Sequence, residues 1–179
     1  MILMHTYTGR SFPVDSPTVG DIDIEDIAHS LSTTCRFCGH SKQFYSVAQH
    51  SVIGASYIAP EFAKWFLLHD ASEAYVNDVI KPQKQYLPLI KTWEDNILSV
   101  IAEKFSLPWP IPDEVKEMDK RLLATEIGQV LNNPSESLWS PWLIDEPLDI
   151  CIVPWSWEDS KAMFLNKFHK LFTEETINV

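Results

Sequence analysis

The sequence predicts an all-α fold, a bundle of about five to seven helices that follows a short N-terminal β-hairpin. Apolar residues recur at the three- and four-residue spacing of helices through most of the 179 residues. Prolines and an Asn-Asn-Pro string separate these stretches from one another. Apolar residue types make up 45% of the chain, which is enough for one buried core at this length. We therefore expect a single domain over residues 1–179.

The first element is the hairpin, because residues 5–12 alternate around Gly9. Acidic residues from Asp21 onward open the first helix, since carboxylates stabilise a helix N-terminus. The segment 61–76 is apolar on nearly all sides, so we expect one central, buried helix there. Further helices are expected over residues 46–58, 90–105, 113–131 and 157–173, with a loop at 81–88 and an irregular, tryptophan-rich stretch at 134–157.

The charge balance limits the classes of partner. Fourteen basic and 25 acidic residues give a net charge of −11 at pH 7. A general polynucleotide binder or anionic-membrane binder needs a dominant basic surface, so we expect neither role. No apolar run approaches the roughly 18 residues of a membrane helix, and no secretory leader is visible. We expect a cytoplasmic protein whose three cysteines form no disulfide framework.

Four polar residues interrupt otherwise apolar helices. His50 lies in the second predicted helix, His69 and Asp70 follow an apolar run in the third, and Asp119 lies in the fifth. Burying an imidazole or carboxylate without a partner costs several kcal/mol, so each of these groups needs one. A divalent cation shared by two imidazoles and two carboxylates is the most economical partner. Taken singly, each residue also fits a hydrogen-bonded core histidine or a helix-capping carboxylate.

A set of nitrogen and oxygen ligands suits Mn²⁺, Co²⁺, Fe²⁺, Ni²⁺ or Zn²⁺ better than Ca²⁺. His69 and Asp70 are neighbours that point about 100° apart on a helix, so both reach one ion only where helices converge. His50 and Asp119, on two other helices, supply that convergence. The Cys35–Cys38 spacing also fits a redox pair or half of a zinc site, but no second such pair completes a four-cysteine site.

The ordered set His50, His69-Asp70 and Asp119 resembles the H…HD…D signature of the HD-domain metal-dependent phosphohydrolases. Three longer strings are similar to the small bacterial 5′-deoxynucleotidases, at residues 44–51, 68–75 and 115–126. They resemble still more closely the phage- and prophage-encoded HD hydrolases, which include deoxyadenosine triphosphate triphosphohydrolases. The resemblance implies an HD-domain helical bundle with its metal-site core at about residues 21–131. Residues 132–179 match less well.

The resemblance implies that the four residues of the signature bind the metal, whose open positions take water and a phosphate oxygen. Glu73 lies one turn beyond Asp70 and is expected to orient or deprotonate the attacking water. Asp78 is expected to be a second catalytic or water-positioning carboxylate. An exposed helix glutamate and a turn aspartate are the alternatives for these two residues.

The resemblance also implies a set of substrate-binding residues. Arg36 and Phe37 resemble the Arg-Trp pair that precedes the first metal histidine of the deoxynucleotidases. Arg36 is then expected to bind phosphate through its guanidinium fork, and Phe37 to pack against the sugar or base. Phenylalanine replaces the family's tryptophan here, which leaves base preference open. The other expected substrate contacts are His40, Lys42, Lys81 and Lys84.

The implied activity is hydrolysis of a 2′-deoxynucleotide by metal-activated attack of water on phosphorus. Both a deoxynucleoside monophosphate 5′-nucleotidase and a dATP-type triphosphohydrolase fit, and a triphosphate would bring an additional Mg²⁺. Hydrolysis of a signalling nucleotide, or nucleotide binding without turnover, are the alternatives. We also expect a homo-oligomer, a dimer or larger, in the cytoplasm, which is the host's cytoplasm if the protein is phage-encoded.

Overall fold

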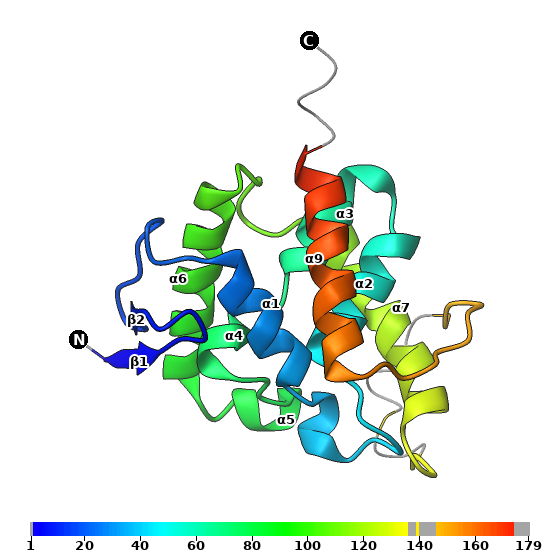
Figure 1. Ribbon diagram of the computed structural model, residues 1–179. Helices are drawn as coiled ribbons and strands as arrows, with labels where there is room; N and C mark the ends of the chain where they lie inside the picture. The colour runs from blue at the N-terminus through cyan, green and yellow to red at the C-terminus, as the bar shows by residue number, and fades with distance from the viewer. Residues whose placement is uncertain (1, 136–138, 140–145, 174–179) are drawn as a thin grey trace.

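The computed structural model describes residues 2–135, 139 and 146–173, apart from the side chains of residues 81 and 82. This part of the chain is mainly helical, with one two-stranded antiparallel sheet at its N-terminus (Figure 1), as predicted. No described helix is both long and apolar enough to cross a membrane. The elements are β1 (Leu3–His5), β2 (Ser11–Pro13), α1 (Ile24–Thr33), η1 (Arg36–Gly39), α2 (Val47–Tyr57), η2 (Pro60–Phe62), α3 (Ala63–Leu68), α4 (Glu73–Val76), α5 (Lys81–Lys84), α6 (Pro88–Lys104), α7 (Asp113–Val130) and α9 (Trp157–Thr173).

The N-terminal hairpin forms as predicted and is attached to α1. Gly9 supplies the turn with a φ of +84°, which is a conformation that glycine adopts without strain. The buried Asp26 carboxylate of α1 accepts hydrogen bonds from the Thr8 backbone N–H at 2.7 Å and from its hydroxyl at 3.0 Å. Phe12 stacks on Tyr75 at 3.8 Å between ring centroids. The hairpin therefore covers one side of the helical core.

Helices α2 and α3 lie in close contact because α2 contains a glycine. A Cβ atom at Gly54 would lie 1.9 Å from Cε1 of Phe66, so only glycine permits this approach. Ser46 begins α2 as its N-cap, and its hydroxyl accepts a hydrogen bond from the Gln49 backbone N–H at 3.1 Å. The tight α2–α3 contact brings His50 of α2 near the end of α3.

The predicted continuous helix over residues 61–76 is wrong, because α3 ends at Leu68 and α4 begins at Glu73. The intervening residues form a tightened turn in which the Glu73 N–H binds the Asp70 carbonyl, three residues back, at 2.9 Å. The His69 side chain explains the break, since its Nδ1 lies 2.6 Å from the Phe66 carbonyl oxygen. It thereby competes with the backbone for that acceptor. The turn keeps Asp70 and Glu73 on one side, because residues three apart eclipse one another in this geometry.

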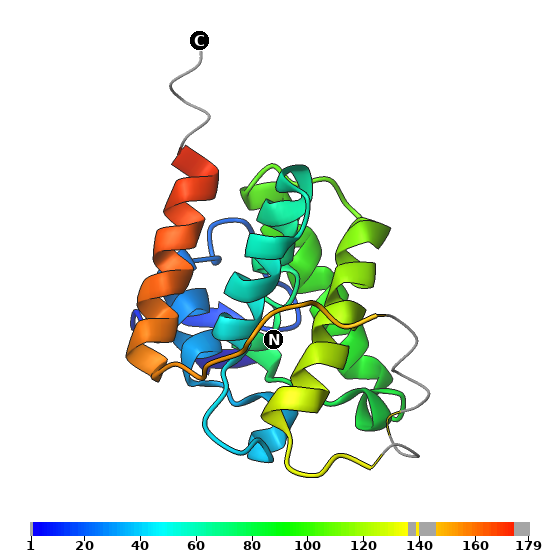
Figure 2. The same ribbon diagram turned by 90° about the vertical axis from the view of Figure 1, so that its right-hand side faces the viewer.

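The segment 81–88, predicted to be a loop, contains the short helix α5 and the first residue of α6. Pro88 occupies the first turn of α6, where its missing N–H costs no hydrogen bond. The predicted helices over 113–131 and 157–173 are confirmed within one residue as α7 and α9. Part of the tryptophan-rich stretch lies outside the described residues, and its last part, residues 146–156, crosses α7 and α2 before α9 begins (Figure 2).

Candidate metal centre

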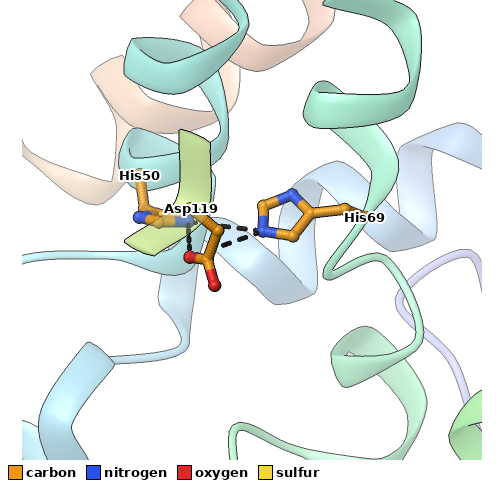
Figure 3. Close-up of side chains that lie close together, drawn as sticks. All are labelled: His50, His69 and Asp119. Atoms are coloured by element: carbon orange, nitrogen blue, oxygen red, sulfur yellow. Dashed lines mark hydrogen bonds and ion pairs between the residues drawn. The ribbon is translucent and has the colours of Figure 1, made fainter. Parts of the chain in front are cut away.

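Three predicted metal ligands meet where α2, the end of α3 and α7 converge. His50 Nε2 lies 3.4 Å from His69 Nε2 and 3.3 Å from Asp119 Oδ1. His69 Nε2 lies 3.9 Å from the same carboxylate oxygen (Figure 3). All three ligand atoms lie within 4.8 Å of one another, so they form a group able to hold a metal ion. Helical packing thus joins residues that are up to 69 positions apart in sequence.

The other nitrogen of each imidazole is already hydrogen-bonded. His50 Nδ1 lies 2.6 Å from Glu126 Oε1, and His69 Nδ1 lies 2.6 Å from the Phe66 carbonyl oxygen. Both partners are acceptors, so each Nδ1 carries a proton, and in the neutral form of each imidazole the Nε2 lone pair faces the centre. In that form, two lone pairs and a carboxylate oxygen are directed at one point, which a cation between them would stabilise. The donor set therefore fits a divalent ion held by imidazole nitrogen and carboxylate oxygen.

Asp70, the fourth predicted ligand, lies at the edge of this group. Its Oδ2 is 3.3 Å from His69 Nε2 and 3.8 Å from His50 Nε2. The same oxygen is 3.5 Å from Nη1 of Arg36, so this carboxylate is shared between the imidazoles and a guanidinium. The structure thus brings all four predicted ligands together, with Asp70 beside the compact group of three.

Without a metal, the carboxylates of the centre favour a protonated histidine. Burial and the Arg36 guanidinium lower the pKa of His50, but Glu126 and Asp119 outweigh them and raise it to about 9. Burial alone would raise the pKa of Asp119, yet hydrogen bonds to the two imidazoles hold it well below its usual range. The metal-free centre therefore holds a proton where a cation fits.

Metal binding at pH 7 is expected to release a proton from His50, because an imidazole coordinates only in its neutral form. Since the pKa of His50 is raised to about 9, the metal affinity should increase with pH up to about 9 and then level off. Because the pKa of His50 is raised in the folded state, protonation of His50 stabilises the metal-free protein. This stabilisation is complete below pH 6.5 and is lost as the pH rises through 9. Calorimetric titration with Co²⁺ in buffers of different ionisation enthalpy measures the released proton. A binding enthalpy that is independent of the buffer would contradict the expectation.

Glu126 is a residue of the centre to which the sequence analysis assigned no role. It is fully buried and accepts hydrogen bonds from His50 Nδ1 at 2.6 Å, the Tyr45 hydroxyl at 2.8 Å and Arg36 Nη2 at 3.0 Å. Burial would raise the pKa of Glu126, but Arg36 and His50 lower it, so the carboxylate is ionised. Glu126 follows Asp119 by seven residues, which is two helical turns, so both lie on one face of α7. This spacing is the sequence feature that could have indicated a role for Glu126 at the centre.

Arg36 lies beside the centre, as predicted, but its guanidinium is paired with protein carboxylates. Nη2 lies 3.0 Å from Glu126 Oε2 and Nη1 lies 3.5 Å from Asp70 Oδ2. Its buried Nε–H has no hydrogen-bond partner among the described residues. Phe37 follows with a φ of +55°, which is unusual for a residue other than glycine, and its ring meets Trp139 edge-on at 6.2 Å.

The two predicted catalytic carboxylates lie near Asp70. Burial raises the pKa of Glu73 well above its usual range, and the Asp70 and Asp78 carboxylates raise it further. Burial also raises the pKa of Asp78. Oε2 of Glu73 has no hydrogen-bond partner in the part of the chain that the structure describes. Lys84 Nζ lies 4.0 Å from Glu73 Oε1 and 2.7 Å from Glu94 Oε1, so its ammonium is bound between buried carboxylates.

Three further substrate contacts were predicted, and the structure describes the side chains of two of them, Lys42 and His40. Lys42 is exposed, and its ammonium donates to the Gln129 carbonyl at 3.1 Å, near the C-terminus of α7. His40 is exposed on the loop after η1. The side chain of Lys81 lies outside the described residues.

No family model matches the chain. Among curated proteins, the uncharacterized protein YfdR of Escherichia coli strain K12 is 40% identical over 173 residues, which are 96% of either chain. An uncharacterized protein of Rhodobacter capsulatus is 34% identical over 127 residues, which are 63% of either chain. The first similarity therefore extends over nearly the whole chain rather than over the metal centre alone.

Proposed function

The chain belongs to the family of Escherichia coli YfdR, and we propose that this member is a metal-dependent phosphohydrolase of the HD type that acts on 2′-deoxynucleotides. The observation that carries the proposal is the convergence of His50, His69 and Asp119 on one point, with the Asp70 carboxylate 3.3 Å from His69. The ordered HD signature supports the same assignment. Two further carboxylates with raised pKa values stand beside this group, where general acid–base catalysis needs them.

A divalent ion held by the four ligands would polarise a phosphoryl oxygen and lower the pKa of a water molecule. Glu73 is suited to receive a proton from that water, because its carboxyl group has a raised pKa and one oxygen without a partner among the described residues. The Nε–H of Arg36, which likewise has no partner in the described part of the chain, is suited to donate to a phosphate oxygen. Asp70 and Glu126 hold the guanidinium in place for this contact.

A cavity of about 450 Å³ beside Glu73 supports a substrate larger than a phosphate group. Its walls are mostly apolar, with Met4, Ile90 and Trp93 among them, while Thr34 contributes a hydroxyl group. Small-molecule sites have volumes of about 300–1,000 Å³ and combine apolar walls with a few polar groups. We assign this cavity to the sugar and base of the nucleotide, with the phosphate at the metal centre.

Replacing Trp93 by alanine is expected to raise KM about tenfold and to change kcat less than twofold. Stacking on an aromatic ring contributes about 1–3 kcal/mol per base, and the lost contact is the same in ground and transition states. Steady-state kinetics on the preferred deoxynucleotide measure the split. Tyr57→Ala, which removes an exposed aromatic ring on α2, is the matched control. An unchanged KM in the Trp93 variant, with its melting temperature retained, would place the base elsewhere.

The chemical product tests the proposal and separates its two versions. The purified protein is incubated with Mn²⁺ or Co²⁺ and a panel of deoxynucleoside mono- and triphosphates, and the products are separated by ion chromatography. Inorganic phosphate from a monophosphate indicates a 5′-nucleotidase, whereas tripolyphosphate from a triphosphate indicates attack at the α-phosphorus. Turnover of signalling nucleotides alone, or of no nucleotide at all, would overturn the proposal.

A further inference from the structure

Residues 146–156, which we call the strap, run across α7 and α2 (Figure 2). Side chains of these two helices hydrogen-bond to the backbone of the strap. On α7, Gln129 donates to the Ile150 carbonyl at 2.7 Å and accepts from the Ile152 N–H at 2.8 Å. On α2, the buried Gln49 donates to the Val153 carbonyl at 2.8 Å and accepts from the Trp155 N–H at 2.9 Å. Each glutamine amide thus pairs with the strap backbone as a neighbouring strand would.

Two more side chains of α7 extend this pairing. The Thr125 hydroxyl accepts from the Leu148 N–H at 2.8 Å, and Arg121 Nε donates to the Glu146 carbonyl at 3.1 Å. The α7 residues are spaced by four, which is a rise of about 6 Å along a helix. Their strap partners Glu146, Leu148 and Ile150 are spaced by two, with a turn at 148–150 closed by the hydrogen bond from the Ile150 N–H to the Leu148 carbonyl at 2.9 Å. The contacts follow one another in the same order along both segments, so the strap has one register on α7.

The strap contacts residues directly next to the metal centre on both helices. Gln49 precedes His50 on α2, and Thr125 precedes Glu126 on α7. Neighbouring helix residues point about 100° apart, so the strap lies beside the face that carries each site residue. The two site residues are themselves joined by the 2.6 Å contact between His50 Nδ1 and Glu126 Oε1. Both ends of that contact are therefore attached to one strap.

We propose that the strap fixes α2 relative to α7, and that Gln49, Thr125 and Gln129 are positioning residues for the metal centre. This inference rests on the metal site proposed above. A metal centre needs its ligands held to within about 0.5 Å, and partners beyond the ligands supply that constraint. Releasing the strap would let His50 move relative to Asp119, although no ligand has been altered.

Gln129→Met tests the proposal, because methionine has a similar length but makes neither hydrogen bond. Glu117→Met, at an exposed position on the same helix, is the matched control. Gln129→Glu is a second test variant, which keeps the acceptor for the Ile152 N–H but loses the donor to the Ile150 carbonyl. Three quantities are measured: amide exchange at Ile152, the NMR resonance of the His50 Nδ1 proton, and the affinity and visible spectrum of bound Co²⁺.

In Gln129→Met we expect faster exchange at Ile152, a shifted or broadened His50 resonance, an altered Co²⁺ spectrum and Co²⁺ affinity lowered at least threefold. Gln129→Glu should be intermediate, and Glu117→Met should match the wild type. Faster Ile152 exchange with an unchanged His50 resonance and unchanged Co²⁺ binding would overturn the proposal, as would unchanged exchange. A wild type that binds no Co²⁺ would refute the proposed function separately, and the His50 resonance would still decide the role of the strap.

Discussion

Replacing His69 by alanine is expected to abolish stoichiometric metal binding and to lower phosphohydrolase activity about a thousandfold or more. His69 supplies one of two imidazole lone pairs at the centre, and its Nε2 lies 3.4 Å from His50 Nε2 and 3.3 Å from Asp70 Oδ2. The remaining nitrogen and two carboxylates would lack the ligand set that selects a transition metal. Metal-based charge stabilisation of the transition state contributes several kcal/mol, which corresponds to this factor.

Elemental analysis of the purified variant, together with activity at saturating Co²⁺, measures this loss. The variant also leaves the Phe66 carbonyl without its imidazole donor, so a destabilisation of about 1–3 kcal/mol should accompany it. Circular dichroism shows whether the fold remains. His169→Ala, at an exposed histidine of α9, serves as the control for removing an imidazole. Full metal content and full activity in a folded His69 variant would rule out the proposed centre.

Replacing Glu126 by glutamine is expected to destabilise the protein by about 3 kcal/mol and to weaken metal binding about 10- to 100-fold. Three donors are directed at this fully buried carboxylate, from Tyr45, Arg36 and His50. The amide replaces one acceptor oxygen by an NH₂ group, so at least one donor loses its partner. The buried guanidinium also loses a countercharge, and leaving a buried charge unpaired costs about 3–5 kcal/mol. The metal affinity falls because the hydrogen-bond partner of a metal-binding histidine orients its ring and raises its basicity.

Urea denaturation of the metal-free protein and Co²⁺ titration of the folded variant measure the two effects separately. Glu117→Gln makes the same chemical change at an exposed position of α7 and should alter neither quantity. If Glu126→Gln bound Co²⁺ as tightly as the wild type, the hydrogen bond to His50 would have no part in preparing the centre.

The sequence pattern predicted the long regular elements, because these depend on local periodicity. It also singled out His50, His69 and Asp119, which the fold brings together into a group able to hold a metal ion. Helices α7 and α9 end within one residue of the predicted bounds. The break after Leu68 was missed, because its cause is a side-chain hydrogen bond from His69 to a backbone carbonyl, which leaves the apolar pattern unchanged. The role of Glu126 was missed for a different reason, since its donors Arg36 and His50 are 90 and 76 residues away.

The strap was not predictable from hydrophobic patterning either. Its attachment depends on amide and hydroxyl groups that pair with backbone atoms, and such groups are also common at exposed positions. The four-residue spacing of Arg121, Thr125 and Gln129 becomes informative only once an extended segment is known to cross α7. The tryptophan-rich composition of the surrounding stretch gave no indication of this register.

The net charge of −11 is partly explained by the centre itself. Asp70, Asp119 and Glu126 all contact His50, and a divalent ion would offset part of their charge. Of the few basic residues, Arg36 and Lys84 lie beside buried acids and are paired with them. Arg36 keeps one N–H that no described residue accepts, so phosphate binding at this centre would depend on the metal and one guanidinium rather than on a basic surface.

The most direct test of the central claim compares the metal-free wild type with the same preparation reloaded with one equivalent of Mn²⁺ or Co²⁺. Metal is removed with a chelator, the fold is verified by circular dichroism, and hydrolysis of deoxynucleoside mono- and triphosphates is followed by product formation. We predict no turnover of either class without metal and turnover of at least one class after reloading. Equal turnover before and after reloading, or none in both states with one equivalent of metal bound, would contradict a metal-dependent deoxynucleotide phosphohydrolase.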